Sequence, residues 1–204
     1  MPTSDCPNCG DVIDPRMAAF RHVVCASCGT SLLIEDDAVR RAGQAGVMHA
    51  AQMLFGLGDR ITVWGTSYDI LGHARFSYGR GFWDEFQARD ADGASAWISV
   101  DEGDIAIQTP LDRSDWPSTT TPPRSNTSVM AGGTSYRVSE FDQAECVALR
   151  GGFDEDLIVG ETYDFVNCTS DTGALLSGEF WTGGRAWFVG DWADPFDIQV
   201  DPAP

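Results

Sequence analysis

From residue 59 onward, apolar and polar residues alternate along most of the chain, and this period of two is typical of half-buried β-strands. The alternation predicts strands over residues 60–64, 74–78, 81–89, 96–100 and 104–108, and again over 135–141, 145–150, 162–168, 174–181 and 185–189. Residues 112–130 are rich in Pro, Ser and Thr and are expected to form a loop. We therefore expect a first β lobe over 57–111 and a second over 131–204, each a small barrel or a sandwich.

One earlier segment has the period of a helix. Asp36 and Asp37 suit a helix N-terminus, and apolar residues then recur at intervals of three and four until Gly56 and Gly58. Residues 36–56 are therefore predicted to form a short connecting helix, although its interior glycines weaken it. Together with an N-terminal unit over 1–35, this gives a mainly β protein with one connecting helix.

Four cysteines give the N-terminal unit its chemistry. Cys6 and Cys9 form one Cys-x-x-Cys pair, Cys25 and Cys28 form another, and each pair is followed directly by glycine. These four cysteines are the candidate ligands of a metal ion. Two residues between thiolates allow one tight turn to present both sulfurs to a tetrahedral ion, and glycine permits the positive φ of such a turn. The spacing predicts a zinc ribbon with one structural zinc ion, because four thiolates leave no open position for catalysis.

Other uses of the cysteines are less consistent with the sequence. Two disulfides would suit an exported protein, but no export signal is present, and a redox pair would follow a strand and open a helix. His22 is expected to lie outside the ligand set, which the four cysteines complete. Cys146 and Cys168 lie in strand-like stretches, and we expect buried free thiols, with a bridge between two strands or a nucleophile as the alternatives.

The charge balance narrows the classes of partner. The 204 residues hold 31 Asp and Glu against 13 basic residues, all of them Arg, for a net charge of -18. Seven acidic and five basic residues lie up to residue 60, so nearly all of the excess lies in the β region. Such a chain repels nucleic-acid phosphates and anionic lipid surfaces. Nucleic-acid binding is therefore not expected, whereas basic proteins and polyamines are attracted.

Aromatic and acidic side chains occur together in both predicted lobes. Packing in the core is the simpler interpretation, and a groove for a cationic ligand is the alternative, because aromatic faces and carboxylates both attract cations. Asp84 and Glu85 are neighbours in a predicted strand, so they should point to opposite faces and cannot act together as an acid–base pair. The candidate ligand or partner surface comprises Tyr78, Trp83, Asp84, Glu85, Trp97, Trp187, Asp191 and Trp192.

The order of these motifs resembles a known family. A Cys-Pro-x-Cys-Gly ribbon is followed by Leu57-Gly58-Asp59, by Tyr78 to Phe86, by Asp92-Gly93 leading to Trp97, by Gly160 to Tyr163 and by Phe188 to Trp192. This resembles the bacterial domain of unknown function 4178 family, from whose pattern Arg80 and Phe86 depart. The resemblance implies no activity and no catalytic residue. It implies an accessory role, because such proteins tend to be encoded near membrane-stress proteins and polyamine-synthesis enzymes.

We expect a non-enzymatic adaptor or accessory protein of a membrane-stress or polyamine-linked system, with a basic or membrane-associated protein partner. A binder of small cations such as polyamines and an uncharacterised enzyme are the alternatives. The N-terminus has no signal pattern, and no apolar run approaches the ~20 residues of a membrane span. We therefore expect no transmembrane segment and a cytoplasmic location, where thiols stay reduced.

Overall fold

The N-terminal unit is a small three-stranded ribbon. The computed structural model describes residues 5–35, 38–49 and 52–203. After the 3-10 helix η1 (Pro15–Ala19), strand β1 (His22–Val24) pairs with β2 (Thr30–Glu35), which pairs with β3 (Ala38–Gln44). The side chains of Phe20, Val23 and Leu32 pack with the cysteines into a core of its own.

The predicted connecting helix over residues 36–56 is wrong in its described part, where Ala38–Gln44 is strand β3. The edge of β2 offers backbone partners, and the glycines permit positive φ, which is 152° at Gly43 and 70° at Gly46 and does not occur in a helix. Beyond β3, the Leu149 amide donates to the Ala45 carbonyl, which joins this segment to the next sheet. Residues 36–37 and 50–51 lie outside the described residues.

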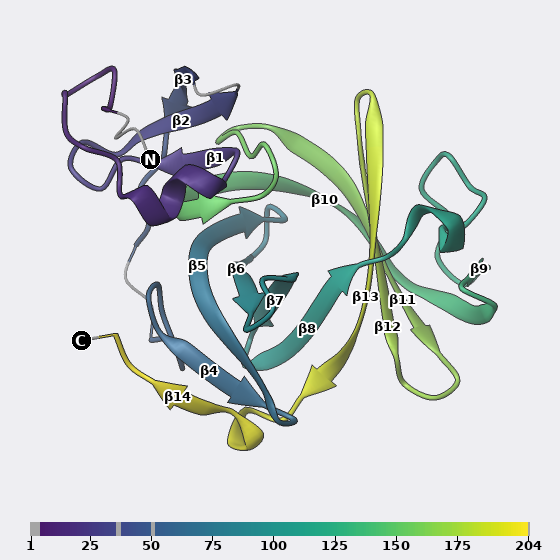
Figure 1. The fold of residues 1–204 in the computed structure, drawn as a ribbon. Helices are drawn as coiled ribbons and strands as arrows, with labels where there is room; N and C mark the ends of the chain where they lie inside the picture. Colours follow the sequence, from purple (N-terminus) through teal and green to yellow (C-terminus); the bar gives the residue numbers. More distant parts are fainter. Residues whose placement is uncertain (1–4, 36–37, 50–51, 204) are drawn as a thin grey trace.

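Eight antiparallel strands form one sheet that closes on itself (Figure 1). They are β5 (Thr66–Ser77), β6 (Phe82–Asp90), β7 (Ser95–Asp101), β8 (Asp104–Pro110), β10 (Thr134–Phe153), β11 (Thr162–Ser170), β12 (Leu175–Trp181) and β13 (Gly184–Ala193). Each group of four pairs in chain order, β8 pairs with β13, and β10 pairs with β5. The strands of both predicted lobes therefore share one closed sheet, which we call the ring.

Strand β10 closes the ring because it is long enough to pair with two neighbours. Its first part pairs with β11, from Tyr136 to Glu145, and its second part pairs with β5, from Cys146 to Gly151. The register shifts near residue 139 and again near 147, and such bulges bend a strand. The predicted strands 135–141 and 145–150 are therefore parts of a single element.

The two halves of the ring repeat the same turn chemistry. At the β6–β7 turn, Asp90 Oδ1 accepts from the amides of Asp92 and Ala94, both at 2.9 Å. At the β11–β12 turn, Ser170 Oγ accepts from the amides of Thr172 and Ala174 at 3.3 and 3.0 Å. A glycine with positive φ follows in each turn. Short polar side chains thus fix both hairpins by hydrogen-bonding their own backbone.

The ring has apolar clusters on its outer side. On one half, Phe86, Ile98 and Ile107 pack with Phe55, with β4 (Arg60–Val63) and with residues next to β14 (Gln199–Asp201). On the other half, a cluster around Leu176 and Trp187 is covered by residues 111–131. This segment, predicted as a loop over 112–130, contains the 3-10 helix η2 (Arg113–Asp115) and the strand β9 (Ser128–Ala131), which pairs with β10. A further 3-10 helix, η3 (Pro195–Asp197), precedes β14.

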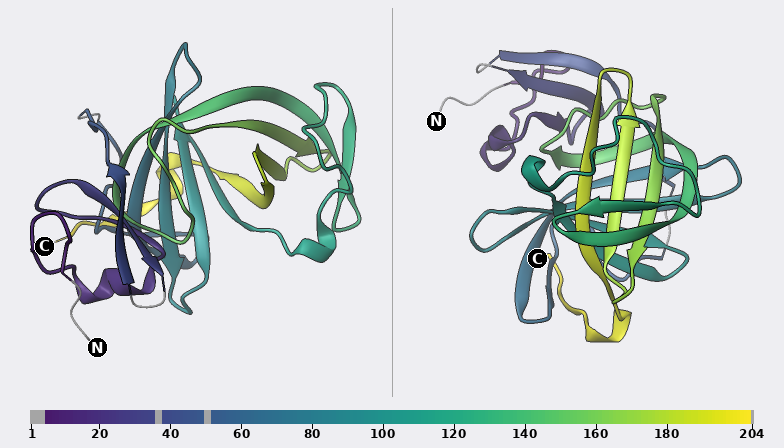
Figure 2. Two further views of the ribbon diagram at one scale, coloured as in Figure 1. Left: turned by 90° about the horizontal axis from the view of Figure 1, so that it is seen from above. Right: turned by 90° about the vertical axis from the view of Figure 1, so that its right-hand side faces the viewer.

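The ribbon and β9 lie at opposite ends of β10 (Figure 2, left). The ribbon joins the ring where His22 of β1 pairs with Phe153 at the end of β10. Nearby, the Arg89 guanidinium lies 4.4 Å from the centre of the Phe20 ring. Within the described residues, no helix is both long and apolar enough to cross a membrane.

Candidate functional sites

The four ribbon cysteines form a site that can hold a metal ion. Their Sγ atoms all lie within 4.8 Å of one another. The distances between Cys6 and Cys28 and between Cys9 and Cys25 are 3.8 and 3.7 Å. The described residues contain no disulfide, since all six cysteines are free.

Two similar turns position the sulfurs. In the first turn, the Gly10 amide donates to the Cys6 carbonyl at 2.8 Å, and in the second the Gly29 amide donates to the Cys25 carbonyl at 2.9 Å. Both glycines have positive φ, 76° and 68°, as the motif predicts. Asn8 of the first turn makes a polar contact with the second, since its Nδ2 lies 3.6 Å from the Cys28 sulfur.

His22 lies in the ribbon but outside this cysteine group. Its side chain is fully buried, Nε2 contacts the Ser31 hydroxyl, and Nδ1 has no partner among the described residues. Burial lowers the pKa of His22 to about 4, although the Asp156 carboxylate acts in the opposite direction. The imidazole of His22 is therefore neutral near pH 7, and it stacks on the Phe153 side chain with 5.7 Å between their centres.

The ring encloses a second candidate site. One cavity of about 290 Å³ and one of about 570 Å³ adjoin each other, since both are lined by Glu85, Trp97, Tyr163 and Glu179. We call this joined space the lumen. Further aromatic side chains of its wall, from β5, β6, β11 and β13, are Phe76, Trp83, Phe165 and Phe188.

Three carboxylic acids meet in the lumen, from β6, β12 and the segment after β10. Burial, and then the charges of Glu155 and Glu85, raise the pKa of Glu179 well above its usual value. Burial likewise raises the pKa of Glu85 to about 7, although hydrogen bonds from Trp83 and Ser99 lower it. Burial also raises the pKa of Glu155, which accepts a hydrogen bond from Trp97. No basic side chain is among the groups that shift these three pKa values.

The pKa of Tyr163 is shifted by the same surroundings. Burial and the nearby charges of Glu179, Glu85 and Glu155 raise the pKa of its hydroxyl well above 10. Closer to one end of the lumen, Gln108 donates to the Ser177 hydroxyl at 2.7 Å, and this hydroxyl donates to Asn167 at 2.8 Å. The wall thus combines aromatic side chains, several of which pack together in one apolar cluster, with neutral polar groups and carboxyl groups.

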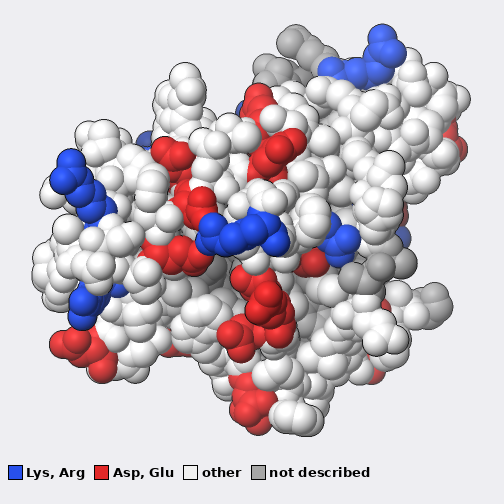
Figure 3. All heavy atoms as spheres, turned by 180° about the vertical axis from the view of Figure 1, so that it is seen from behind, with Lys and Arg blue, Asp and Glu red and all other residues white. Residues whose placement is uncertain are grey.

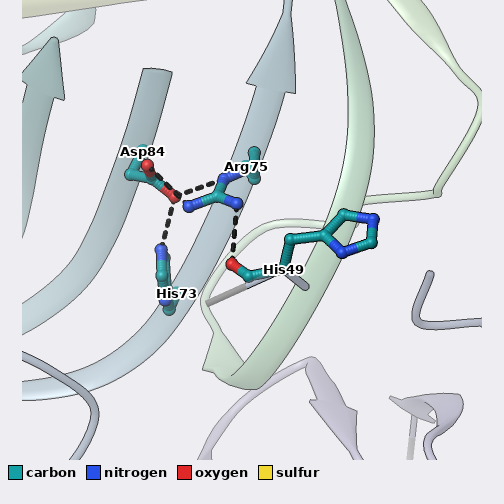
Figure 4. A network of polar contacts seen from close by, with 4 residues as sticks. All are labelled: His49, His73, Arg75 and Asp84. Atoms are coloured by element: carbon teal, nitrogen blue, oxygen red, sulfur yellow. Dashed lines mark hydrogen bonds and ion pairs between the residues drawn. The ribbon is translucent and has the colours of Figure 1, made fainter. Parts of the chain in front are cut away.

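A different polar network lies on the opposite face of β5 and β6 (Figure 4). Asp84 accepts hydrogen bonds from Arg75 at 2.9 and 3.1 Å and contacts His73 Nε2 at 2.6 Å. Arg75 also donates to the His49 carbonyl at 2.9 Å, which holds the segment between ribbon and ring. Burial would raise the pKa of Asp84, but the hydrogen bonds of both partners lower it, so the carboxylate stays ionised and acts structurally.

Residues 56–195 match the family described as Domain of unknown function (DUF4178). The chain belongs to this family. The matched range begins after the ribbon and contains the whole ring. No curated protein and no solved structure matches the chain.

In this DUF4178 chain, the eight residues predicted to form a ligand or partner surface lie in different parts of the structure. Five of them line the lumen: Tyr78, Trp83, Glu85, Trp97 and Trp192. Asp84 belongs to the network with Arg75, Trp187 is buried in the outer cluster, and Asp191 is exposed outside the cavity lining. Asp84 and Glu85 do face opposite sides of β6, as their adjacency predicts.

Sequence reasoning missed the two acids that complete the group in the lumen. Glu179 sits between Gly178 and Phe180 in an alternating strand, and this period places it on the face opposite Phe180. No local signal says that this face is enclosed. Glu155 lies in the Asp154-Glu155-Asp156 run of a connecting segment, where an acidic triplet normally indicates solvent exposure.

The two remaining cysteines are free and buried. Burial raises the pKa of Cys146 and of Cys168 to about 12 each. A thiol protonated at neutral pH is a weak nucleophile. The expectation of buried free thiols is therefore confirmed, and the bridge between two strands is absent.

Proposed function

We propose that the lumen binds a small organic cation, such as a polyamine, without catalysing its conversion. One observation carries the proposal: Glu85, Glu155 and Glu179 converge in an aromatic-lined cavity, and no basic side chain is among the groups that shift their pKa values. Carboxyl groups in that position strain the free protein, because burial and mutual repulsion both oppose their ionisation. A bound cation would relieve both effects.

The aromatic wall and the overall charge support the same ligand class. Trp83 stacks on Phe76 with 5.3 Å between ring centres, and Trp97 stacks on Phe153 at 6.1 Å, so these indole rings are held in place. Aromatic faces attract ammonium groups most strongly where water is excluded. On the surface opposite to the view of Figure 1, carboxylates form a band with arginines in and beside it (Figure 3). A net charge of -18 would speed the approach of a cation.

Binding should be linked to protonation. A cation favours the ionised carboxyl groups and therefore lowers their pKa values. Below pH 7, where Glu85 is largely protonated, binding should release protons, and affinity should rise with pH until Glu85 is ionised. Between pH 5 and pH 8, we expect affinity to increase by about 10-fold or more.

Isothermal titration calorimetry with spermidine tests the proposal. The double variant Glu85→Gln with Glu179→Gln keeps the shape of the wall and removes its charge, so we expect about 100-fold weaker binding, from two charge-assisted contacts. Asp171→Asn is the matched control, because Asp171 is an exposed acid in the β11–β12 turn. It removes one negative charge without touching the lumen and should leave affinity unchanged.

Two outcomes would contradict the proposal. If spermidine binds both variants as it binds the wild type and all binding disappears with salt, the attraction is nonspecific. If no heat is detected between pH 6 and pH 8, the lumen does not take this ligand. Heat that continues after saturation would instead favour the enzyme alternative, since carboxyl groups of raised pKa also serve as general acids.

For the ribbon, we propose one structural zinc ion bound by Cys6, Cys9, Cys25 and Cys28. A tetrahedral ion with Zn–S bonds of about 2.3 Å requires sulfurs about 3.8 Å apart. The two measured distances of 3.8 and 3.7 Å fit this value. Four thiolates would fill the coordination sphere, so the metal would stabilise the fold rather than react.

The adaptor role, its protein partner and the cytoplasmic location stay predictions. Free thiols at six positions suit a reducing compartment, which supports the location. A ligand-binding ring attached to a metal-stabilised ribbon is compatible with an accessory protein that responds to a small molecule.

A further inference from the structure

The end of the lumen next to residues 111–116 carries arginines beside a tryptophan. Arg113 and Arg185 both line the larger cavity, and their guanidinium carbons lie 5.5 and 5.4 Å from the centre of the Trp116 ring. The Trp116 indole is held by a 2.8 Å hydrogen bond to the Leu111 carbonyl. We call this end, defined by Arg113, Trp116 and Arg185, the arginine mouth.

Arg185 is unpaired in an acidic protein. Its Nε is buried without a hydrogen-bond partner, and no hydrogen bond or ion pair joins it to another described residue. A buried donor without a partner costs free energy, so its retention calls for an explanation. A ligand acceptor at the mouth would supply the missing partner.

Two of the acids that line the larger cavity are already paired with arginines other than Arg113 and Arg185. Asp154 forms an ion pair with Arg89 at 2.5 Å, and Asp156 forms one with Arg21 at 2.8 Å. Arg185 thus lines the cavity beside Trp116 without an ion pair to another described residue. An anionic group of a ligand beside Trp116 would meet the guanidinium groups of Arg113 and Arg185, although acidic residues also line this cavity.

The opposite end of the lumen has the reverse character. Its lining includes Asp101, Asp104 and Glu140. Burial and the charges of neighbouring acids, Glu140 and Asp104 among them, raise the pKa of Asp101. Arg80, the cation at this end, is paired with Asp142 at 3.0 Å. The two ends therefore differ in their arginines: Arg80 is ion-paired, whereas no ion pair joins Arg113 or Arg185 to another described residue.

We propose that the ligand is zwitterionic, with an ammonium group at Glu85 and Glu179 and a carboxylate or phosphate group at Arg185 and Arg113. This rests on the proposed function and gives the ligand a direction in the lumen. Neither arginine is among the groups that influence the central carboxyl groups. Arg113 and Arg185 line only the larger cavity, whereas Glu85 and Glu179 line both cavities, so we place a spacer of several atoms between the two charges of the ligand.

Calorimetry with three probes of equal spacer length tests this inference: hexylamine, 6-aminohexanoate and 6-aminohexyl phosphate. We expect one of the two zwitterions to bind the wild type at least 10-fold more tightly than hexylamine, since a charged hydrogen bond is worth about 1.5–3 kcal/mol. The probe that binds better identifies the anionic group. In Arg185→Gln this advantage should fall to less than about 3-fold.

Hexylamine affinity monitors the folded lumen, and it should stay the same or rise in Arg185→Gln, because a repelling cation is removed. Arg124→Gln is the matched control: Arg124 is exposed and far from the cavity lining, and the variant should keep the full advantage of the zwitterion. The inference is overturned if hexylamine binds as tightly as both zwitterions, or if their advantage survives in Arg185→Gln. Failure of hexylamine and spermidine alike would instead remove the proposed function.

Discussion

The ribbon and the ring both gather like-charged or potentially charged side chains around a centre, but they do so over very different sequence distances. In the ribbon, two short turns of the same motif bring all four sulfurs together. In the ring, Glu85, Glu155 and Glu179 come from three separate segments that meet only when the sheet closes. A site formed by a local motif can thus be predicted from the sequence, whereas a site formed by distant strands cannot.

The two regions also differ in what offsets the electrostatic cost. Thiolates would be balanced by the proposed metal ion, and the ribbon has only a small apolar core of its own. The ring has apolar clusters on its outer side and tolerates carboxyl groups inside by raising their pKa values. The ribbon should therefore depend on its metal, while the ring should fold with its lumen empty.

Metal removal should have the largest effect and should be confined largely to the ribbon. Metal binding contributes about 10–16 kcal/mol to folding in comparable peptides. After chelation, we expect amide hydrogen exchange in β1 and β2 to become fast, while β6, β7 and β12 stay protected. The segment after Phe153 should lose protection too, because β1 pairs with Phe153 and Arg21 pairs with Asp156.

Cys28→Ser should reproduce this exchange pattern without a chelator. Cys168→Ala serves as its control, because Cys168 is buried in the ring and far from the ligand set in sequence. The control should keep the metal content of the wild type. Ribbon amides that stay protected in metal-free protein would show that the ribbon does not need the ion.

Asp84→Asn should have the next largest effect, and it acts at the connection between the two regions. Removing one partner of a buried ionic network costs about 3–5 kcal/mol, because the other charges stay buried. Asp69→Asn, in an exposed pair with Arg60 at 2.6 Å, should cost only about 0.2–1 kcal/mol. Urea denaturation of both variants measures the difference, and equal losses would contradict a structural role for the network.

Glu85→Gln should have the smallest effect, visible in the pH dependence of stability. The folded-state pKa of about 7 lies above the ordinary 4.5, so the folded protein binds the proton more tightly. This stability is fully present below pH 4.5 and is lost as the pH rises through 7, by up to about 3 kcal/mol. The variant should therefore lose less stability than the wild type between pH 4.5 and pH 8.

Thermal or urea unfolding at a series of pH values measures this effect in ligand-free protein. The exposed Asp171→Asn variant is again the control and should follow the wild-type curve. An unchanged pH dependence in Glu85→Gln would mean that Glu85 is better solvated than its burial in the lumen implies. Spermidine should reduce the difference between wild type and variant, since it favours the ionised carboxyl group.

Several features were predictable because they depend on neighbours in the sequence. The cysteine spacing determined the metal site, and alternation determined most strands of the ring, including β6, β7 and β12. The prediction failed where local pattern and pairing compete. Residues 38–44 carry a helix-like period, yet the open edge of β2 draws them into a strand, since backbone partners outweigh a weak helix propensity.

By itself, the sequence determined the cysteine centre, the β character and the acidity of the chain, because each of these follows from residues that are adjacent or simply counted. Only the tertiary structure decided that β10 pairs with both β11 and β5 and so closes the sheet. The closure of the sheet determines which face of each strand is enclosed. The alternating sequence pattern does not reveal this face, since both faces of β6 carry aromatic and acidic residues. The lumen, its three carboxyl groups and its unpaired Arg185 exist for that reason alone.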